Sequence, residues 1–165
     1  MKPDTILSVQ REHLPACLAT LHAAFSASAE RFGYTEETYP TSGAYLTLAD
    51  LEEALCRHVH MYAALLNGEV VGYVQLEKLM PGVYSFQRFA VLPAYQGQGI
   101  GRALIDHCRM RAAAIGAKKL TLLMIYENET LRHFYEVNGF RLVRVERDPR
   151  YPFTCGIMEM PIGNE

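Results

Sequence analysis

The stretch AYQGQGIGRAL, residues 94–104, constrains the fold of this chain more than any other segment. It places three glycines, Gly97, Gly99 and Gly101, within five residues and directly before a helix-forming run. Residues 83–92 before it (VYSFQRFAVL) are apolar on both faces of an alternating pattern, which predicts a strand in the middle of a sheet. The loop therefore joins a buried strand to the first turn of a helix.

Two interpretations of the glycines remain open. The N-terminus of a helix carries unpaired N–H groups and a partial positive charge, and glycines allow a phosphate or pyrophosphate to approach those groups closely. The other interpretation is a tight turn without a ligand. A Walker phosphate loop is excluded because Arg102 and Ala103 follow Gly101, and the glycine spacing does not fit the G-x-G-x-x-G pattern of dinucleotide-binding folds.

Strand and helix patterns alternate along the rest of the chain. The Asn67-Gly68 turn predicts a hairpin over 60–66 and 69–77, and Thr47 with Asp50 predicts the start of a helix. No repeat or linker interrupts the pattern, so we expect one mixed α/β domain, 1–165, with one sheet. The other expected strands are 5–10, 83–92, 119–125, 140–146 and 153–160, and the expected helices are 13–30, 48–58, 99–115 and 129–137.

Alternation within residues 83–92 predicts which side chains share a face of the central strand. Both sets are largely apolar, so we expect both faces to be covered. One face would carry Val83, Ser85, Gln87, Phe89 and Val91, and the other Tyr84, Phe86, Arg88 and Ala90.

Charge and hydropathy exclude several classes of function. The net charge of -2 gives no basic surface for nucleic acid. No apolar run approaches the ~20 residues that span a membrane, and the first ten residues, MKPDTILSVQ, lack the apolar segment of a signal peptide. We therefore expect a cytoplasmic protein with no nucleic-acid or membrane partner.

Cysteine and histidine spacing predicts no metal site. His58 and His60 could share one face of a strand, but no third ligand is close in sequence. The cysteines form no C-x-x-C pair, so we expect buried, reduced thiols. They are Cys17, Cys56, Cys108 and Cys155.

Two motifs resemble the GNAT superfamily of N-acyltransferases. Residues 96–101 (QGQGIG) fit the acyl-CoA signature Q/R-x-x-G-x-G/A of this family, and Asn128 with FYEVNGF at 134–140 resembles its N…FY…GF segment. The resemblance covers nearly the whole chain. It implies a mixed, mostly antiparallel sheet of about seven strands, flanked by about four helices and splayed open between the fourth strand (83–92) and the fifth (119–125).

The resemblance also implies an acetyl-CoA site and no metal. The pantetheine arm would lie in the opening, along the edge formed by Phe89, Ala90 and Val91, and the N–H groups of 97–102 would hold the pyrophosphate. Asn128 matches a CoA-contacting asparagine of the family, although asparagine is also a good helix cap. Arg102 either contacts the pyrophosphate or is solvated. The loop positions assigned to the site are Gln96, Gly97, Gln98, Gly99, Ile100, Gly101 and Arg102.

Tyr135 is the candidate catalytic residue. It matches the tyrosine of the family's FY segment, which commonly acts as the general acid that protonates the leaving CoA thiolate. The spacing of Leu131, Phe134, Tyr135 and Asn138 is also that of a buried helix face, so a purely structural tyrosine is the alternative.

The general base is less defined. Several relatives have a glutamate eleven residues before the first residue of the signature, where this chain has Ser85. Glu77, which ends the neighbouring strand, either acts through a water molecule or is a solvated carboxylate.

In this fold the acceptor would enter opposite CoA, over the loop 32–46. Arg147 and Arg150, which flank the segment 151–160, would bind a carboxylate or remain solvated. The aromatic and acidic side chains of the loop either receive a cationic amine or pack against one another. They are Phe32, Tyr34, Glu36, Glu37, Tyr39 and Tyr45.

The expected function is transfer of acetyl from acetyl-CoA to a primary amine of a small molecule or peptide. The alternatives are acetylation of protein N-termini or lysines, and a non-catalytic module that senses acyl-CoA. Family members are often dimers, so a homodimer is a further expectation by analogy.

Overall fold

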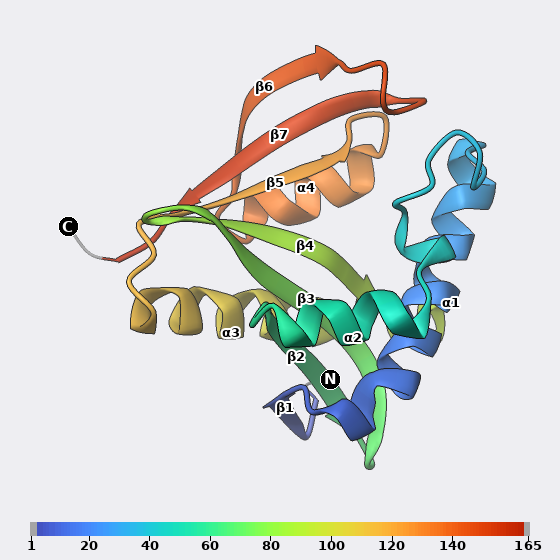
Figure 1. Ribbon diagram of the computed structural model, residues 1–165. Coiled ribbons are helices and arrows are strands. Elements are labelled where there is room, and N and C mark those ends of the chain that lie inside the picture. The colour runs from blue at the N-terminus through green and yellow to red at the C-terminus, as the bar shows by residue number, and fades with distance from the viewer. Residues whose placement is uncertain (1–2, 164–165) are drawn as a thin grey trace.

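The computed structural model describes residues 3–163, which build one seven-stranded sheet with helices packed on both faces (Figure 1). The strand order is β1-β2-β3-β4-β5-β7-β6, and only β4 and β5 pair in parallel. The strands are β1 (Thr5–Ser8), β2 (His60–Leu66), β3 (Glu69–Met80), β4 (Val83–Val91), β5 (Lys119–Ile125), β6 (Arg141–Arg147) and β7 (Thr154–Pro161). The α-helices of the described residues are α1 (Leu14–Phe32), α2 (Leu48–Cys56), α3 (Ile100–Ala114) and α4 (Glu129–Val137). This confirms the predicted fold class and element order.

Two hydrophobic clusters lie on opposite faces of the sheet. One packs α1 and α2 against β2 and β3 and includes Leu21, Leu51 and Tyr73. The other packs α3 and α4 against the sheet and includes Leu104 and Tyr135. No helix among residues 3–163 is long and apolar enough to cross a membrane.

Local signals in the sequence form as predicted. Asn67 and Gly68 both have positive φ, 53° and 79°, which is the conformation of a type I′ hairpin turn. The Thr47 side chain accepts from the Asp50 N–H, and the Asp50 carboxylate accepts from the Thr47 N–H, which caps α2 at both positions. The hairpin turn fixes the register of β2 against β3, and the capping box fixes where α2 begins.

The sheet opens between β4 and β5, as predicted. The two strands pair only over Val83–Ser85 and Lys119–Thr121, although β4 continues to Val91 and β5 to Ile125. Figure 1 shows the two strands separating beyond this short contact, with α4 beneath β5. The far half of β4 therefore has no neighbouring strand on its β5 side.

The predicted alternation of side chains along β4 is wrong beyond Gln87. Tyr73 and Gln75 of β3 pair with Ala90 and Gln87, so two steps on β3 match three on β4. This β-bulge contains Arg88, whose φ is 54°. One extra residue exchanges the faces of the side chains that follow. As a result Ala90 joins the cluster under α1 and α2, while Phe89 packs with the cluster under α3 and α4.

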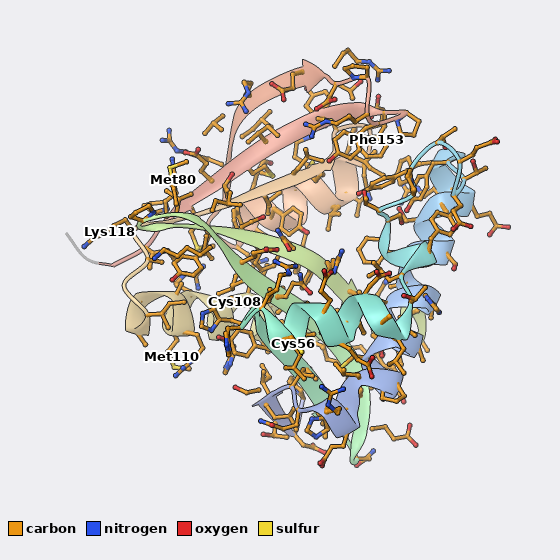
Figure 2. The ribbon with its side chains drawn as sticks, viewed as in Figure 1. Cys56, Met80, Cys108, Met110, Lys118 and Phe153 are labelled. Atoms are coloured by element: carbon orange, nitrogen blue, oxygen red, sulfur yellow. The ribbon has the colours of Figure 1, made fainter. Side chains whose placement is uncertain are left out.

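All four cysteines are free thiols, and three of them are buried as predicted. The prediction is wrong for Cys56, which is exposed at the last position of α2 (Figure 2). A short amphipathic helix turns its final residue away from the core once its apolar stripe ends. Among residues 3–163, no three or more His, Cys, Asp or Glu side chains gather in a group that could hold a metal ion, and His58 and His60 are part of no such group.

Candidate functional site

The glycine-rich loop presents a row of main-chain donors. Gly97 and Gly99 adopt positive φ, 78° and 91°, which glycine tolerates best. The first N–H of α3 that bonds back into the turn is that of Ala103, which donates to the Gly99 carbonyl at 3.1 Å. Within residues 3–163, none of the N–H groups of 97–102 donates a hydrogen bond outside the helix. Successive free donors at a helix N-terminus are suited to an anion.

Gly101 has a different reason for being glycine. A Cβ at this position would lie 3.0 Å from the ring of Phe89 and 3.1 Å from the ring of Phe134. Those two rings stack with a centroid distance of 6.1 Å. Gly101 thus allows β4 and α4 to close against the first turn of α3.

A cavity of about 420 Å³, which we call the loop cavity, lies beside this turn. It is lined by most residues that the sequence assigned to CoA, namely Phe89, Ala90, Val91, Gln96, Gly97, Gly99, Gly101, Arg102 and Asn128. Gln98 and Ile100 do not line it. Ile100 is fully buried in the core, and the Gln98 side chain donates to the Ala94 carbonyl at 3.3 Å.

Three polar residues of the loop cavity have distinct local roles. Gln96 donates its side-chain amide to the Val91 carbonyl at 3.0 Å, which ties the loop to the end of β4. Asn128 caps α4 by accepting from the Leu131 N–H at 3.1 Å, so the capping role is real and the side chain also lines the cavity. Arg102 is exposed in the first turn of α3, where its charge opposes the helix dipole.

A second cavity of about 390 Å³, the strand cavity, fills the opening between β4 and β5. Its walls come from β3, β4 and β5, from the loop between α1 and α2, and from Tyr151 and Phe153 before β7. The two cavities share Phe25, Ser28, Phe89, Asn128 and Leu131 as lining residues. They therefore adjoin each other at the bulged part of β4.

Tyr135 is one of the residues that line the strand cavity. Its ring packs among those of Phe86, Phe89, Phe134 and Phe140, with centroids 5.5 to 6.1 Å away. Its hydroxyl makes no hydrogen bond with residues 3–163, and the residue lines the strand cavity. Burial raises the pKa of this phenol above its ordinary value. The ring is a core residue that also lines the cavity, and the catalytic role of the hydroxyl stays a prediction.

Glu77 is another lining residue of the strand cavity. It pairs across the β-ladder with Ser85, and both residues line the cavity. Its carboxylate forms an ion pair with Arg57, which follows α2. The carboxylate closest to the expected base position is thus neither free nor fully solvated.

The sequence pattern that defines the acetyltransferase (GNAT) family matches residues 21–140. The chain belongs to this family. Mycothiol acetyltransferase of Streptomyces coelicolor is 35% identical over 96 residues, which are 58% of this chain and 30% of that protein. The ribosomal protein bS18-alanine N-acetyltransferase of Escherichia coli is 32% identical over 101 residues, 58% of this chain and 67% of its own length.

Solved structures show the same fold. The crystal structure of the ribosomal-protein-S18-alanine N-acetyltransferase from Escherichia coli has a TM-score of 0.77 at 21% identity, over 98% of this chain and 95% of that one. PaiA N-acetyltransferase from Thermoplasma acidophilum, in complex with coenzyme A, has a TM-score of 0.75 at 19% identity, over 95% and 98%. At these identities the likeness establishes the GNAT fold and nothing finer.

The outer wall of the strand cavity in this GNAT protein is aromatic. Tyr34 and Tyr39 line it, together with Tyr151 and Phe153. Figure 2 shows Phe153 beside the loop between α1 and α2, and its ring lies 5.3 Å from that of Tyr39. Of the loop residues singled out from the sequence, Phe32, Tyr45, Glu36 and Glu37 do not line the cavity.

The arginines proposed from the sequence lie elsewhere in this GNAT chain. Arg150 pairs with Asp148 at 2.6 Å, Arg147 donates to Thr154, and neither lines either cavity. Arg88, which sequence reasoning placed on the strand without a role, does line the strand cavity. The only signal that could have marked it was an arginine at an otherwise apolar strand position.

Proposed function

We propose that the protein transfers the acetyl group of acetyl-CoA to a primary amine of a small molecule or peptide. Membership of the family establishes the general activity, that of an acyl-CoA-dependent acyltransferase. The observation that carries the finer proposal is the pair of adjoining cavities at the bulge of β4, one beside free main-chain donors and the other beside Tyr135 and Glu77. Such an arrangement brings two substrates together at one strand edge.

The loop cavity fits the donor. The N–H groups of 97–102 are available to a diphosphate, and the cavity continues along Phe89, Ala90 and Val91, where β4 has no partner strand on its β5 side. An extended pantetheine arm can pair with such an edge as a further strand would. The neighbour named as a complex with coenzyme A shares this fold.

Acetyl-CoA, when bound, supplies a thioester whose acyl carbon is open to attack by an amine. The net change forms one N–C bond, breaks one C–S bond and moves one proton from nitrogen to sulfur. The Tyr135 hydroxyl is the group of this chain that gives the proton to sulfur, and it recovers a proton from the amine through solvent. The burial that raises the pKa of Tyr135 also raises that of a thiol beside it, so the transfer remains feasible.

The amine must lose a proton before it attacks. A primary amine with a pKa of about 10 is neutral in roughly one molecule in a thousand at pH 7, which corresponds to about 4 kcal/mol. Glu77 acts as the base through a water molecule, with the Arg57 ion pair fixing its orientation. Ser85 and Gln87 line the same wall and hold that water, since neither is itself a base.

The test measures thiol release when the protein is mixed with acetyl-CoA and a panel of amines and short peptides. Release that depends on a particular amine, with formation of its acetamide by mass spectrometry, supports the enzyme. Peptides preferred over every small amine would favour the protein N-terminal alternative. A rise in melting temperature with CoA but no acetamide from any acceptor would identify a sensor instead.

A further inference from the structure

Arg88 brings an uncompensated positive charge to the strand cavity. Glu77 and Arg88 are the only charged side chains among its lining residues. The Glu77 carboxylate is already paired with Arg57. Arg88, by contrast, makes no ion pair and no side-chain hydrogen bond with any of residues 3–163. A partly buried guanidinium without a partner is uncommon, because burial of a charge is costly unless the charge is paired.

The backbone at Arg88 carries a second, independent signal. Its φ of 54° lies in the left-handed region, which is strained for residues other than glycine, asparagine or aspartate. Glycine would be the easier residue at this bulge. The chain keeps an arginine at this strained position, and its side chain lines the strand cavity. This favours a role of the Arg88 side chain in binding a ligand of the cavity.

Gln87, the neighbour of Arg88 on β4, offers further hydrogen-bond donors to the strand cavity. Burial raises the pKa of both Tyr39 and Tyr73, and the Arg88 charge opposes that rise. Tyr73 donates to Gln75 at 2.6 Å, and Gln75 donates to the Gln87 side-chain oxygen at 2.8 Å. This chain uses the oxygen of Gln87 and leaves its amide N–H groups without a partner among residues 3–163.

We infer that the strand cavity takes an acceptor amine that also carries a carboxylate, as a free amino acid does, and that Arg88 with the Gln87 amide holds that carboxylate. The inference rests on the proposed acetyl transfer and specifies its acceptor. A guanidinium offers two parallel N–H groups that match the two oxygens of a carboxylate. An acceptor with positive charge only, such as a polyamine, would face the unpaired Arg88 charge and be disfavoured.

The experiment compares acceptors that differ only in the carboxylate. L-phenylalanine is paired with L-phenylalaninamide, and L-methionine with L-methioninamide, at saturating acetyl-CoA. The amides have less basic amines, so a larger fraction of them is neutral at pH 7, and a preference for the acids cannot arise from a larger supply of neutral amine. We expect the wild-type kcat/KM to be at least tenfold higher for the acids. Equal values, or higher values for the amides, would overturn the inference.

Three variants assign the preference to Arg88. In Arg88→Gln, kcat/KM for the acids should fall roughly 10- to 100-fold while that for the amides changes less than about threefold, as expected for a lost charged hydrogen bond. Arg88→Gly removes the same group and relieves the strained φ, so it keeps the fold while losing the preference. Arg150→Gln is the matched control, because Arg150 is already paired with Asp148 and its loss should leave the preference intact.

A binding measurement separates failure of the inference from failure of the proposed function. Calorimetry compares N-acetyl-L-phenylalanine with its amide as ligands of the protein in the presence of CoA. If no acceptor is acetylated, the proposed function fails, yet tighter binding of the acid that disappears in Arg88→Gln still supports the carboxylate site. If amines without a carboxylate are acetylated efficiently and N-acetyl-L-phenylalanine binds no more tightly than its amide, acetyl transfer stands and the inference is wrong.

Discussion

The substitution Tyr135→Phe separates the structural role of Tyr135 from its catalytic role. The ring keeps its packing against Phe86, Phe89, Phe134 and Phe140, since phenylalanine has the same ring. The lost hydroxyl makes no hydrogen bond with residues 3–163, so no partner is left unsatisfied. We therefore expect the free energy of unfolding to change by less than about 1 kcal/mol, or roughly 2–4 °C in melting temperature.

The catalytic effect should be far larger. General-acid catalysis typically contributes 10²–10⁴-fold, so we expect kcat to fall by about 10² or more, which is at least ~2.7 kcal/mol in the activation barrier. Because burial raises the pKa of Tyr135, the phenol stays protonated up to and beyond pH ~10. Loss of activity on the alkaline side below that pH should therefore not arise from ionisation of Tyr135.

Two other tyrosines are matched controls. Tyr62→Phe also removes a buried hydroxyl without a hydrogen bond; Arg111 lies near enough to affect the pKa of Tyr62 but outside hydrogen-bond geometry. Tyr62 lines neither cavity, so Tyr62→Phe should leave both the stability and kcat unchanged. Tyr73→Phe breaks the 2.6 Å bond to Gln75 and should cost about 1–3 kcal/mol. The assays are thermal melts and single-turnover acetyl transfer. A folded Tyr135→Phe with the wild-type single-turnover rate would refute the general-acid role.

Three further predictions concern the loop, the base and a buried thiol. Gly97→Asp should weaken CoA binding about 10- to 100-fold by calorimetry, because a carboxylate ~6 Å from a phosphate is repelled by roughly 1–3 kcal/mol. Two control variants should retain most of the affinity: Gly97→Asn, which is neutral, and Gly116→Asp, which is distant and also at a positive φ of 85° in open space. Equal losses of affinity in all three variants would contradict the pyrophosphate site. Glu77→Gln should lower kcat/KM about 10²-fold at pH 7 but much less at pH 10, where about half of the amine is already neutral. A loss of kcat/KM that is independent of pH would exclude Glu77 as a base. Burial raises the pKa of Cys17 from about 9 to about 12, so the stability that the buried neutral thiol contributes is complete below pH 9 and is lost between pH 9 and 12 at about 1.4 kcal/mol per pH unit. In Cys17→Ala, the free energy of unfolding in urea should fall less steeply with pH over that range. An unchanged pH dependence would contradict the raised pKa of Cys17.

The parts of the fold that depend on local chemistry could be predicted from the sequence. Asn67-Gly68 fixes a hairpin through positive φ, and the loop glycines mark the turn before α3 because few other residues adopt its conformation. The bulge at Arg88 has no such signal. It arises where β3 and β4 differ by one residue in their pairing, which is a property of two strands together. The face of every side chain from Arg88 to Val91 was therefore beyond an argument from alternation alone.

The candidate site shows the same division. Gln96, Gly97 and Gly99 were assigned from one motif and Asn128 from another, and the structure places all four beside one cavity. Arg88 belongs to no motif, and its significance comes from what surrounds it, namely a paired Glu77, a Gln87 amide oriented by Tyr73 and Gln75, and the absence of a carboxylate partner among the described residues. Such an environment exists only once strands far apart in sequence have been brought together.

The bulge also explains why one strand can contribute to both cavities. Without the extra residue, Phe89 would share a face with Gln87, and the Phe89 ring would enter the space now bordered by Tyr39 and Arg88. With it, Gln87 and Arg88 are consecutive residues that both line the strand cavity, while Phe89 turns to stack on Phe134 beside Gly101. The polar groups proposed to hold the acceptor and the apolar surface proposed for the donor thus come from adjacent residues of β4. A deletion of one residue at this bulge should therefore impair donor and acceptor binding together, whereas Arg88→Gly should impair only the acceptor.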